Sequence, residues 1–250
     1  MRKEGGGPRQ LWVGRTPADR SAATFTHVAG LDGLIGPYSR PSYLPGASDR
    51  VLIVAAGNLY DVDLGTGATY AVNLSLPSGE PLVAVSVAPD GARIAMVTAS
   101  KVYVATIDSS KPPVTIGVNS AQLRELYVGN LVDLRGVAWN FEHQIIVGGR
   151  SGLMITAIDG GTLTSLGPNG LQGAQLTQLS AVPRDPINNL GGDVVIEATS
   201  TSGLQSYFPL SQLVAANAPA ASRPSPAPSA SASAPPSDPR VTAAFYADVI

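Results

Sequence analysis

The sequence predicts an all-β protein of the β-propeller class, and a weak internal repeat is the main reason. Aligning Pro45, Pro89, Asn140 and Pro183 gives successive steps of about 44, 51 and 43 residues, a spacing typical of propeller blades. The composition agrees, because 27 glycines, 21 prolines and only 14% charged residues are typical of short strands joined by tight turns. Each repeat is therefore expected to form one blade.

The chain divides into a propeller region and terminal segments. Residues 1–8 are glycine-rich and are expected to be flexible, and residues 9–214 form the propeller region. Residues 215–240 are rich in alanine, proline and serine. We expect them to be disordered, because such a segment cannot bury enough apolar area to offset its chain entropy. Residues 241–250 form a short C-terminal segment whose order the sequence does not decide.

Apolar runs between turn residues define the strands of each unit. A first, partial unit consists of a strand at residues 10–14, which a polar stretch follows to about residue 35. The strands expected in the second to fifth units are residues 40–45, 51–55, 59–64 and 69–74; 82–88, 93–98, 101–107 and 114–117; 134–139, 144–148, 153–158 and 163–166; and 176–182, 194–198 and 203–208. Four recognisable blades and a partial one predict an incomplete ring.

The third unit has the clearest turn chemistry. Pro89 fixes its own φ, and Asp90 followed by Gly91 tolerates positive φ, so this tripeptide predicts a hairpin turn. The glycine-rich stretch 148–152 is also interpreted as a turn. It lacks the Lys-Ser or Lys-Thr end of a phosphate-binding loop, and it opens no helix.

Charge and cysteine content exclude several functions. The formal net charge is -2, from 16 basic and 18 acidic residues, and this balance gives no basic face for nucleic acid. The absence of cysteine excludes disulfides, thiolate metal sites and a cysteine nucleophile. The N-terminus lacks the apolar run of a signal peptide. No stretch approaches the roughly 18 apolar residues that a membrane-spanning helix needs.

Three charged residues lie near the ends of expected inner strands. Arg40, Asp90 and Arg135 are therefore candidate residues for the mouth of a central channel. Asp61 and Asp63 alternate along one strand and are interpreted as the solvated face of an outer strand. We predict no catalytic, cofactor-binding or metal-binding residue.

Histidines and aromatic residues receive structural interpretations. His27 and His143 are interpreted as exposed turn residues, because no nucleophile or orienting partner accompanies either of them. Large aromatic residues recur at comparable places in the units, and we expect them to pack between blades. These residues are Trp12, Tyr43, Tyr60, Tyr103 and Trp139.

Five stretches together resemble the C-terminal β-propeller of the actinobacterial lipoprotein LpqB family, over roughly residues 9–210. The stretches are Gln10–Gly14, Tyr38–Tyr43, Val85–Val97, Lys101–Ala105 and Gly136–Trp139. In that family a lipid-anchored segment and a GerMN-type domain precede the propeller. The resemblance therefore implies that this chain is a C-terminal part of such a lipoprotein, without the signal peptide and the lipobox cysteine.

The resemblance also implies a function. The chain would be a non-enzymatic protein-interaction module of an envelope lipoprotein on the outer face of the cytoplasmic membrane, without a cofactor. Its partner would be the extracellular part of a two-component sensor kinase, to which the lipoprotein is an accessory. The insertions at residues 118–130 and 183–193 are the candidate contact loops, because loops on a rigid scaffold usually carry binding.

Two other interpretations stay open. A propeller enzyme or small-ligand binder would use the central channel, and would place clustered carboxylates or histidines at the starts of the inner strands. A truncated gene remnant without a present role would account for the missing blades.

Overall fold

The computed structural model describes most of the propeller region. The described residues are 10–15, 24–34, 38–46, 49–117, 123–140, 143–150, 152–159, 164–166, 175–181, 194–199 and 205–211. The predictions for residues 1–8, 215–240 and 241–250 fall outside them, as does the insertion at residues 183–193.

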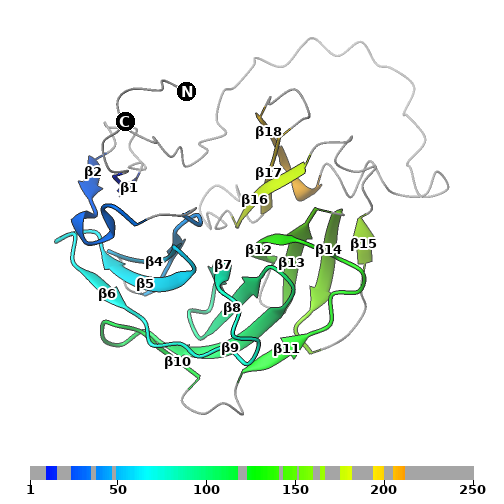
Figure 1. Cartoon of the computed structure of the whole chain (residues 1–250), viewed down its shortest axis with the longest axis horizontal. Coiled ribbons are helices and arrows are strands. Elements are labelled where there is room, and N and C mark those ends of the chain that lie inside the picture. The colour runs from blue at the N-terminus through cyan, green and yellow to red at the C-terminus, as the bar shows by residue number, and fades with distance from the viewer. Residues whose placement is uncertain are drawn as a thin grey trace, which may run out of the picture.

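The described residues form five antiparallel sheets that follow one another around a common centre, from blue through cyan and green to orange in Figure 1. The first sheet pairs β1 (Trp12–Arg15) with β2 (Thr24–His27). The second contains β3 (Ser42–Tyr43), β4 (Arg50–Ala55), β5 (Asn58–Asp63) and β6 (Thr69–Ala71). The third contains β7 (Leu82–Val87), β8 (Arg93–Thr98), β9 (Val102–Asp108), β10 (Thr115–Ile116) and β11 (Arg124–Leu126). The fourth contains β12 (Leu134–Asn140), β13 (Gln144–Gly149), β14 (Gly152–Ala157) and β15 (Thr164–Leu166). The fifth contains β16 (Gln175–Ala181), β17 (Val194–Thr199) and β18 (Gln205–Pro209).

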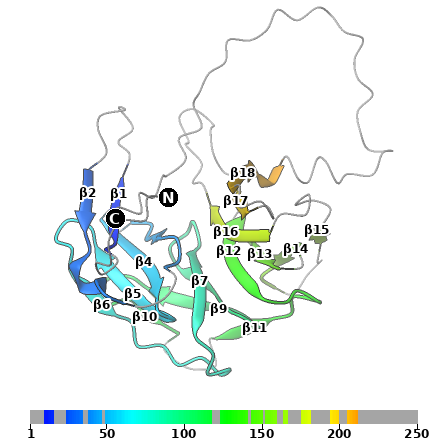
Figure 2. The same ribbon diagram turned by 45° about the horizontal axis from the view of Figure 1, so that its top comes forward.

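This arrangement confirms the all-β propeller prediction. Within each sheet the strands pair in chain order, apart from β10 and β11, which both pair with β9. The first strands of successive sheets stand next to one another, since β7 contacts β3 and β12, and β12 contacts β16. Figure 2 shows β7 between the second and fourth sheets.

Local sequence explains the third sheet well. The predicted hairpin joins β7 to β8, where the N–H of Gly91 donates to the carbonyl oxygen of Ala88 at 2.9 Å. Gly91 has a φ of 71°, in the left-handed region that glycine adopts without a steric cost. An added Cβ would also lie 3.2 Å from the carbonyl oxygen of Pro45. This turn therefore packs closely against the second sheet.

The apolar core lies between sheets rather than within one layer. Among the described residues there are four buried apolar clusters: three join two successive sheets, and the fourth packs the segment after β2 against the second sheet. Tyr103 is 1% exposed in the cluster between the second and third sheets, and Trp139 is 2% exposed between the third and fourth. The indole N–H of Trp139 donates to the carbonyl oxygen of Ser86 at 2.8 Å across that interface. The packing predicted for these two aromatic residues is confirmed.

Two segments differ from the sequence predictions. The stretch expected to be polar up to residue 35 contains β2 and a short 3-10 helix, Ala29–Leu31, whose Leu31 is fully buried. The insertion at residues 118–130 contributes β11, which pairs with β9. Both strands are short and lack an apolar run, so they have little local signal.

Candidate functional site

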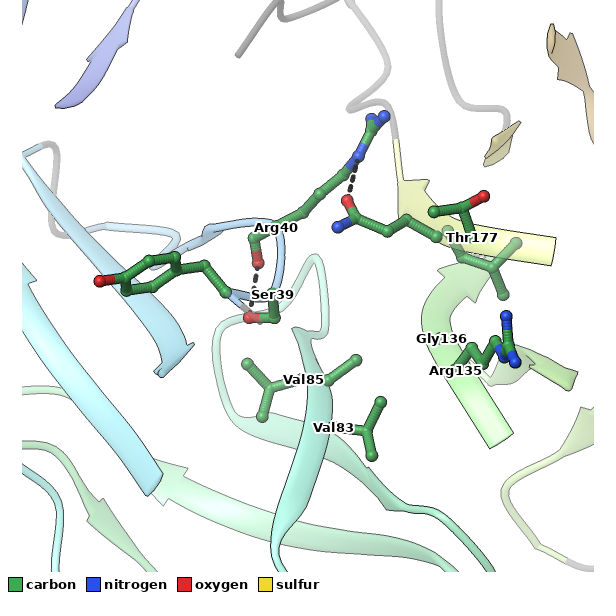
Figure 3. Close-up of a pocket in the computed structure, with 11 residues that line it drawn as sticks. Ser39, Arg40, Val83, Val85, Arg135, Gly136 and Thr177 are labelled. Atoms are coloured by element: carbon green, nitrogen blue, oxygen red, sulfur yellow. Dashed lines mark hydrogen bonds between the residues drawn. The ribbon is translucent and has the colours of Figure 1, made fainter. Parts of the chain in front are cut away.

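A central cavity of about 300 Å³ lies where four of the sheets meet. It is lined by the segment before β3, by β7, by β12 and by β16 (Figure 3). Its lining residues are Tyr38, Ser39, Arg40, Val83, Ala84, Val85, Arg135, Gly136, Thr177, Gln178 and Leu179. The cavity belongs to the central channel of the propeller. It lies at the end of the channel where the inner strands β7, β12 and β16 begin.

A repeated irregularity shapes this cavity. The register between the first two strands shifts at the same place in the third, fourth and fifth sheets. The extra residues are Val83, Arg135 and Thr177, and all three line the cavity. A β-bulge bends its strand and re-aims the neighbouring side chains. The bulges therefore turn one side chain from each of three sheets towards the channel.

Arg40 links the second sheet to the fifth across the channel. Its Nε donates to Oε1 of Gln178 on β16 at 2.7 Å, and its Nη2 forms an ion pair with Glu197 on β17. The Arg40 and Glu197 side chains are only 13% and 10% exposed. The guanidinium carbon also lies 5.9 Å from the ring centroid of Tyr207 on β18. We call this set of contacts the Arg40 latch.

Arg135 also lines the cavity, but its surroundings are more open. It forms an ion pair with Asp133, with Nη2 2.7 Å from Oδ2, and these side chains are 35% and 46% exposed. Figure 3 shows Arg40 reaching towards β16, whereas Arg135 lies beside Gly136 at the start of β12. The two guanidinium groups do not converge, and each one faces a carboxylate of the chain itself.

Asp90 lies away from the cavity, in the turn between β7 and β8. Its Oδ1 accepts the N–H of Ala92 at 2.9 Å, and its Oδ2 accepts Nε of Arg93 at 2.9 Å. Burial acts to raise the pKa of Asp90. The hydrogen bonds from Ala92 and Arg93 outweigh it and hold the pKa below the ordinary value of 3.8. Arg93 in turn lies 5.3 Å from the ring centroid of Trp139, so Asp90 organises a turn at the opposite end of β7.

The two strand aspartates have different roles, which corrects the prediction of a common solvated face. Asp61 is fully buried, and its carboxylate accepts the N–H of Val114 at 2.9 Å and Nε of Arg50 at 3.1 Å. Arg50 also donates to the carbonyl oxygen of Ser109 at 2.6 Å. This polar cluster joins the second sheet to the β9–β10 connection. Asp63 instead caps the turn after β5, and the N–H of Thr66 lowers the pKa of Asp63.

The histidines do not reach the channel cavity. His143 lies exposed in the turn before β13, as predicted. His27 was expected in a turn, but it lies on β2 and stacks on Trp12 with ring centroids 4.9 Å apart. Its Nε2 is 2.9 Å from Oδ1 of Asp32. The described part of the chain contains no group of three or more side chains that could hold a metal ion.

An exposed apolar segment precedes one of the strands that line the channel. The connection from β11 to β12 contains Tyr127, which is 74% exposed, and Val132, which is 57% exposed. This connection runs directly into Arg135, a residue that lines the cavity. Tyr127 falls in the insertion at residues 118–130 that the sequence indicated as a contact loop. Val132 lies just beyond that insertion and was missed, because a single valine beside a strand resembles a core position.

The described fold and its central cavity define a β-propeller module. The chain belongs to the LpqB lipoprotein family: the model of the lipoprotein LpqB β-propeller domain matches residues 4–221. The family resemblance drawn from the sequence is therefore confirmed, and membership of a lipoprotein family suggests a location in the cell envelope. Among the described residues, no helix is long and apolar enough to cross a membrane.

Two solved structures match this chain. One is a chain from the crystal structure of a nidogen/laminin complex, with a TM-score of 0.52, 12% identity, and coverage of 80% of this chain and 78% of that chain. The other is the Cps50 (Swd1) β-propeller domain from Myceliophteria thermophila, with a TM-score of 0.43, 11% identity, and coverage of 71% and 53%. At such low identity the first similarity shows the fold alone. No curated protein sequence matches this chain.

Proposed function

We propose that the chain is a non-enzymatic protein-interaction module of an envelope lipoprotein and that it assists a two-component sensor kinase. The observation that carries the proposal is the match to the lipoprotein LpqB β-propeller domain over residues 4–221. The partner would be the extracellular part of the kinase. The lipoprotein would act on the outer face of the cytoplasmic membrane.

The chemistry of the channel favours a binding role over catalysis. Among the described lining residues, Arg40 and Arg135 are the charged ones, and each forms an ion pair with a carboxylate of the chain. Thr177 shares a 2.9 Å hydrogen bond with Thr199. These side chains stabilise the propeller itself. The described residues that line this cavity include no nucleophile paired with a general base, as covalent catalysis requires.

The proposed mechanism is a shift in the conformational balance of the kinase. A rigid propeller that binds one state of the extracellular part more tightly favours that state by the difference in binding free energy. A tenfold preference corresponds to about 1.4 kcal/mol. The apolar clusters between sheets provide the rigidity, and the exposed connections provide the contacts.

A direct binding measurement tests this proposal. The purified chain would be presented to the immobilised extracellular part of the sensor kinase, with the extracellular part of an unrelated kinase as the control. We expect saturable binding to the first alone. Full-length kinase in liposomes should then change its autophosphorylation rate when the chain is added. Equal binding to both kinases, or none to either, would refute the proposed function.

The cavity supports one second candidate function. A volume of about 300 Å³ is at the lower limit of common ligand pockets, so a small sugar or peptide would be the occupant. Thermal unfolding of the wild-type chain with such compounds, compared with an Arg135→Met variant, tests this candidate. A rise in Tm that the variant lacks would support a ligand site, and unchanged Tm values would remove it.

A further inference from the structure

The most exposed large apolar side chain among the described residues lies in the connection between β11 and β12. Tyr127 is 74% exposed, and Val132 in the same connection is 57% exposed. Arg150, in the turn between β13 and β14, is also exposed and lies beside this connection. We call residues 127–133 together with Arg150 the rim patch.

The backbone of the rim patch is held from both sides. The N–H of Leu131 donates to the carbonyl oxygen of Val128 at 3.3 Å, which closes a turn between Tyr127 and Val132. The N–H of Arg150 lies 3.0 Å from the carbonyl oxygen of Val132 and 3.1 Å from that of Asp133. The side chain of Val128 is buried in the cluster between the third and fourth sheets. The exposed side chains therefore project from an ordered frame, which reduces the entropy cost of binding.

Charge at the rim patch is unevenly compensated. Asp133 pairs with Arg135, and nearby Glu125 pairs with Lys101 at 2.5 Å. The guanidinium of Arg150 forms no hydrogen bond or ion pair with any described side chain. The rim patch thus combines an exposed tyrosine with an exposed arginine, two residue types that are enriched in interface cores.

We propose that the rim patch is the docking surface for the protein partner, and that the partner inserts a carboxylate beside an apolar side chain. The carboxylate pairs with Arg150, and the apolar group packs on Tyr127 and Val132. This inference rests on the proposed function for the identity of the partner. The chemistry of the docking segment follows from the patch itself, because opposite charge across an interface favours association.

Substitutions on the rim patch with matched controls test the inference. The rim variants are Tyr127→Ser and Arg150→Glu. Their controls are Tyr70→Ser, at an exposed tyrosine of β6, and Lys111→Glu, at an exposed cation in the β9–β10 connection. Each rim variant should weaken binding to the extracellular part of the kinase at least tenfold, while each control stays within twofold. Because these positions are exposed, all four variants should keep the wild-type Tm.

A peptide array tests the same chemistry without the kinase. Immobilised peptides carrying glutamates beside leucine or phenylalanine are compared with copies in which lysine replaces each glutamate. The wild-type chain should bind the acidic set, and Arg150→Glu should lose that preference or invert it.

The two assays separate the failure of each proposal. If the kinase binds and the rim variants bind as the wild type does, the rim patch is excluded and the proposed function stands. If the kinase does not bind but the acidic peptides bind through Arg150, the rim patch stands and the kinase is excluded as the partner. If the wild-type chain binds neither probe, both proposals are overturned.

Discussion

Breaking the Arg40 latch should destabilise the attachment of the fifth sheet. The Arg40 and Glu197 side chains are 13% and 10% exposed, so removing one charge leaves the other largely buried. Such a change typically costs about 3–5 kcal/mol. Because both groups keep some contact with solvent, we expect about 3 kcal/mol each for Arg40→Met and for Glu197→Gln. The double variant should also lose about 3 kcal/mol, which gives a coupling free energy of about 3 kcal/mol.

Urea unfolding followed by circular dichroism at pH 7 measures these free energies. A loss of about 3 kcal/mol corresponds to a fall in Tm of roughly 6–12 °C for a chain of this size. Arg135→Met is the matched control, because Arg135 lines the same cavity but pairs with Asp133 in an exposed position. Exposed pairs contribute about 0–1 kcal/mol, so this variant should remain close to the wild type.

Hydrogen exchange locates the effect within the fold. In Arg40→Met the amides of β16–β18 should lose more protection than those of β7–β9, because the contacts of the latch reach β16, β17 and β18. The reasoning is refuted if both single variants lose less than about 1 kcal/mol, if their losses add in the double variant, or if Arg135→Met loses as much as Arg40→Met.

Three further predictions concern the interfaces between sheets and the acid stability. Gly148→Ala should cost about 1–3 kcal/mol by overpacking, because an added Cβ would lie 2.0 Å from Cδ2 of the buried Leu176; an unchanged Tm would contradict this. Asp61→Asn should lower the free energy of unfolding, measured in urea, by about 3–5 kcal/mol, because Asp61 is fully buried and pairs with the guanidinium of Arg50. A loss below about 1 kcal/mol would contradict this prediction. Asp63 and Asp90 have folded pKa values below the ordinary 3.8, so their stabilisation is present above that value and is lost as the pH falls through the folded pKa. Between about pH 5 and pH 2 the loss of stability with falling pH, followed by circular dichroism, should therefore be smaller for the Asp63→Asn and Asp90→Asn variants than for the wild type. Equal losses in the variants and the wild type would show that these two carboxylates do not contribute to acid unfolding.

Much of the strand pattern could be predicted because it depends on neighbours in the chain. The strand predicted at residues 93–98 coincides with β8, and the predicted hairpin joins it to β7. Alternating apolar residues and Pro-Asp-Gly turns act over a few residues, so they are visible in one sequence. The strands β2 and β11 were missed, because their pairing with β1 and β9 supplies stability that their own residues do not signal.

The candidate site could be predicted in part. Arg40 and Arg135 were expected at the channel mouth from their similar offsets before inner strands, and both line the cavity. Asp90 was placed with them because it too borders an inner strand. It lies after β7 rather than before it, and therefore at the opposite end. The bulges that aim Arg135 and Thr177 towards the cavity depend on register between strands, which periodicity along one strand does not reveal.

The sequence by itself determined the repeat, most of the strands, the Pro-Asp-Gly turn and the family, because each of these follows from residue order and local backbone preference. Tertiary structure alone decided which polar groups are buried. Asp61 alternates like an exposed residue, and it is buried because the β9–β10 connection of the next sheet covers it. Arg40 and Glu197 lie 157 residues apart, and they form an ion pair only because the sheets curve around one channel. Contacts of this kind depend on the summed packing of all the sheets, so no local pattern encodes them.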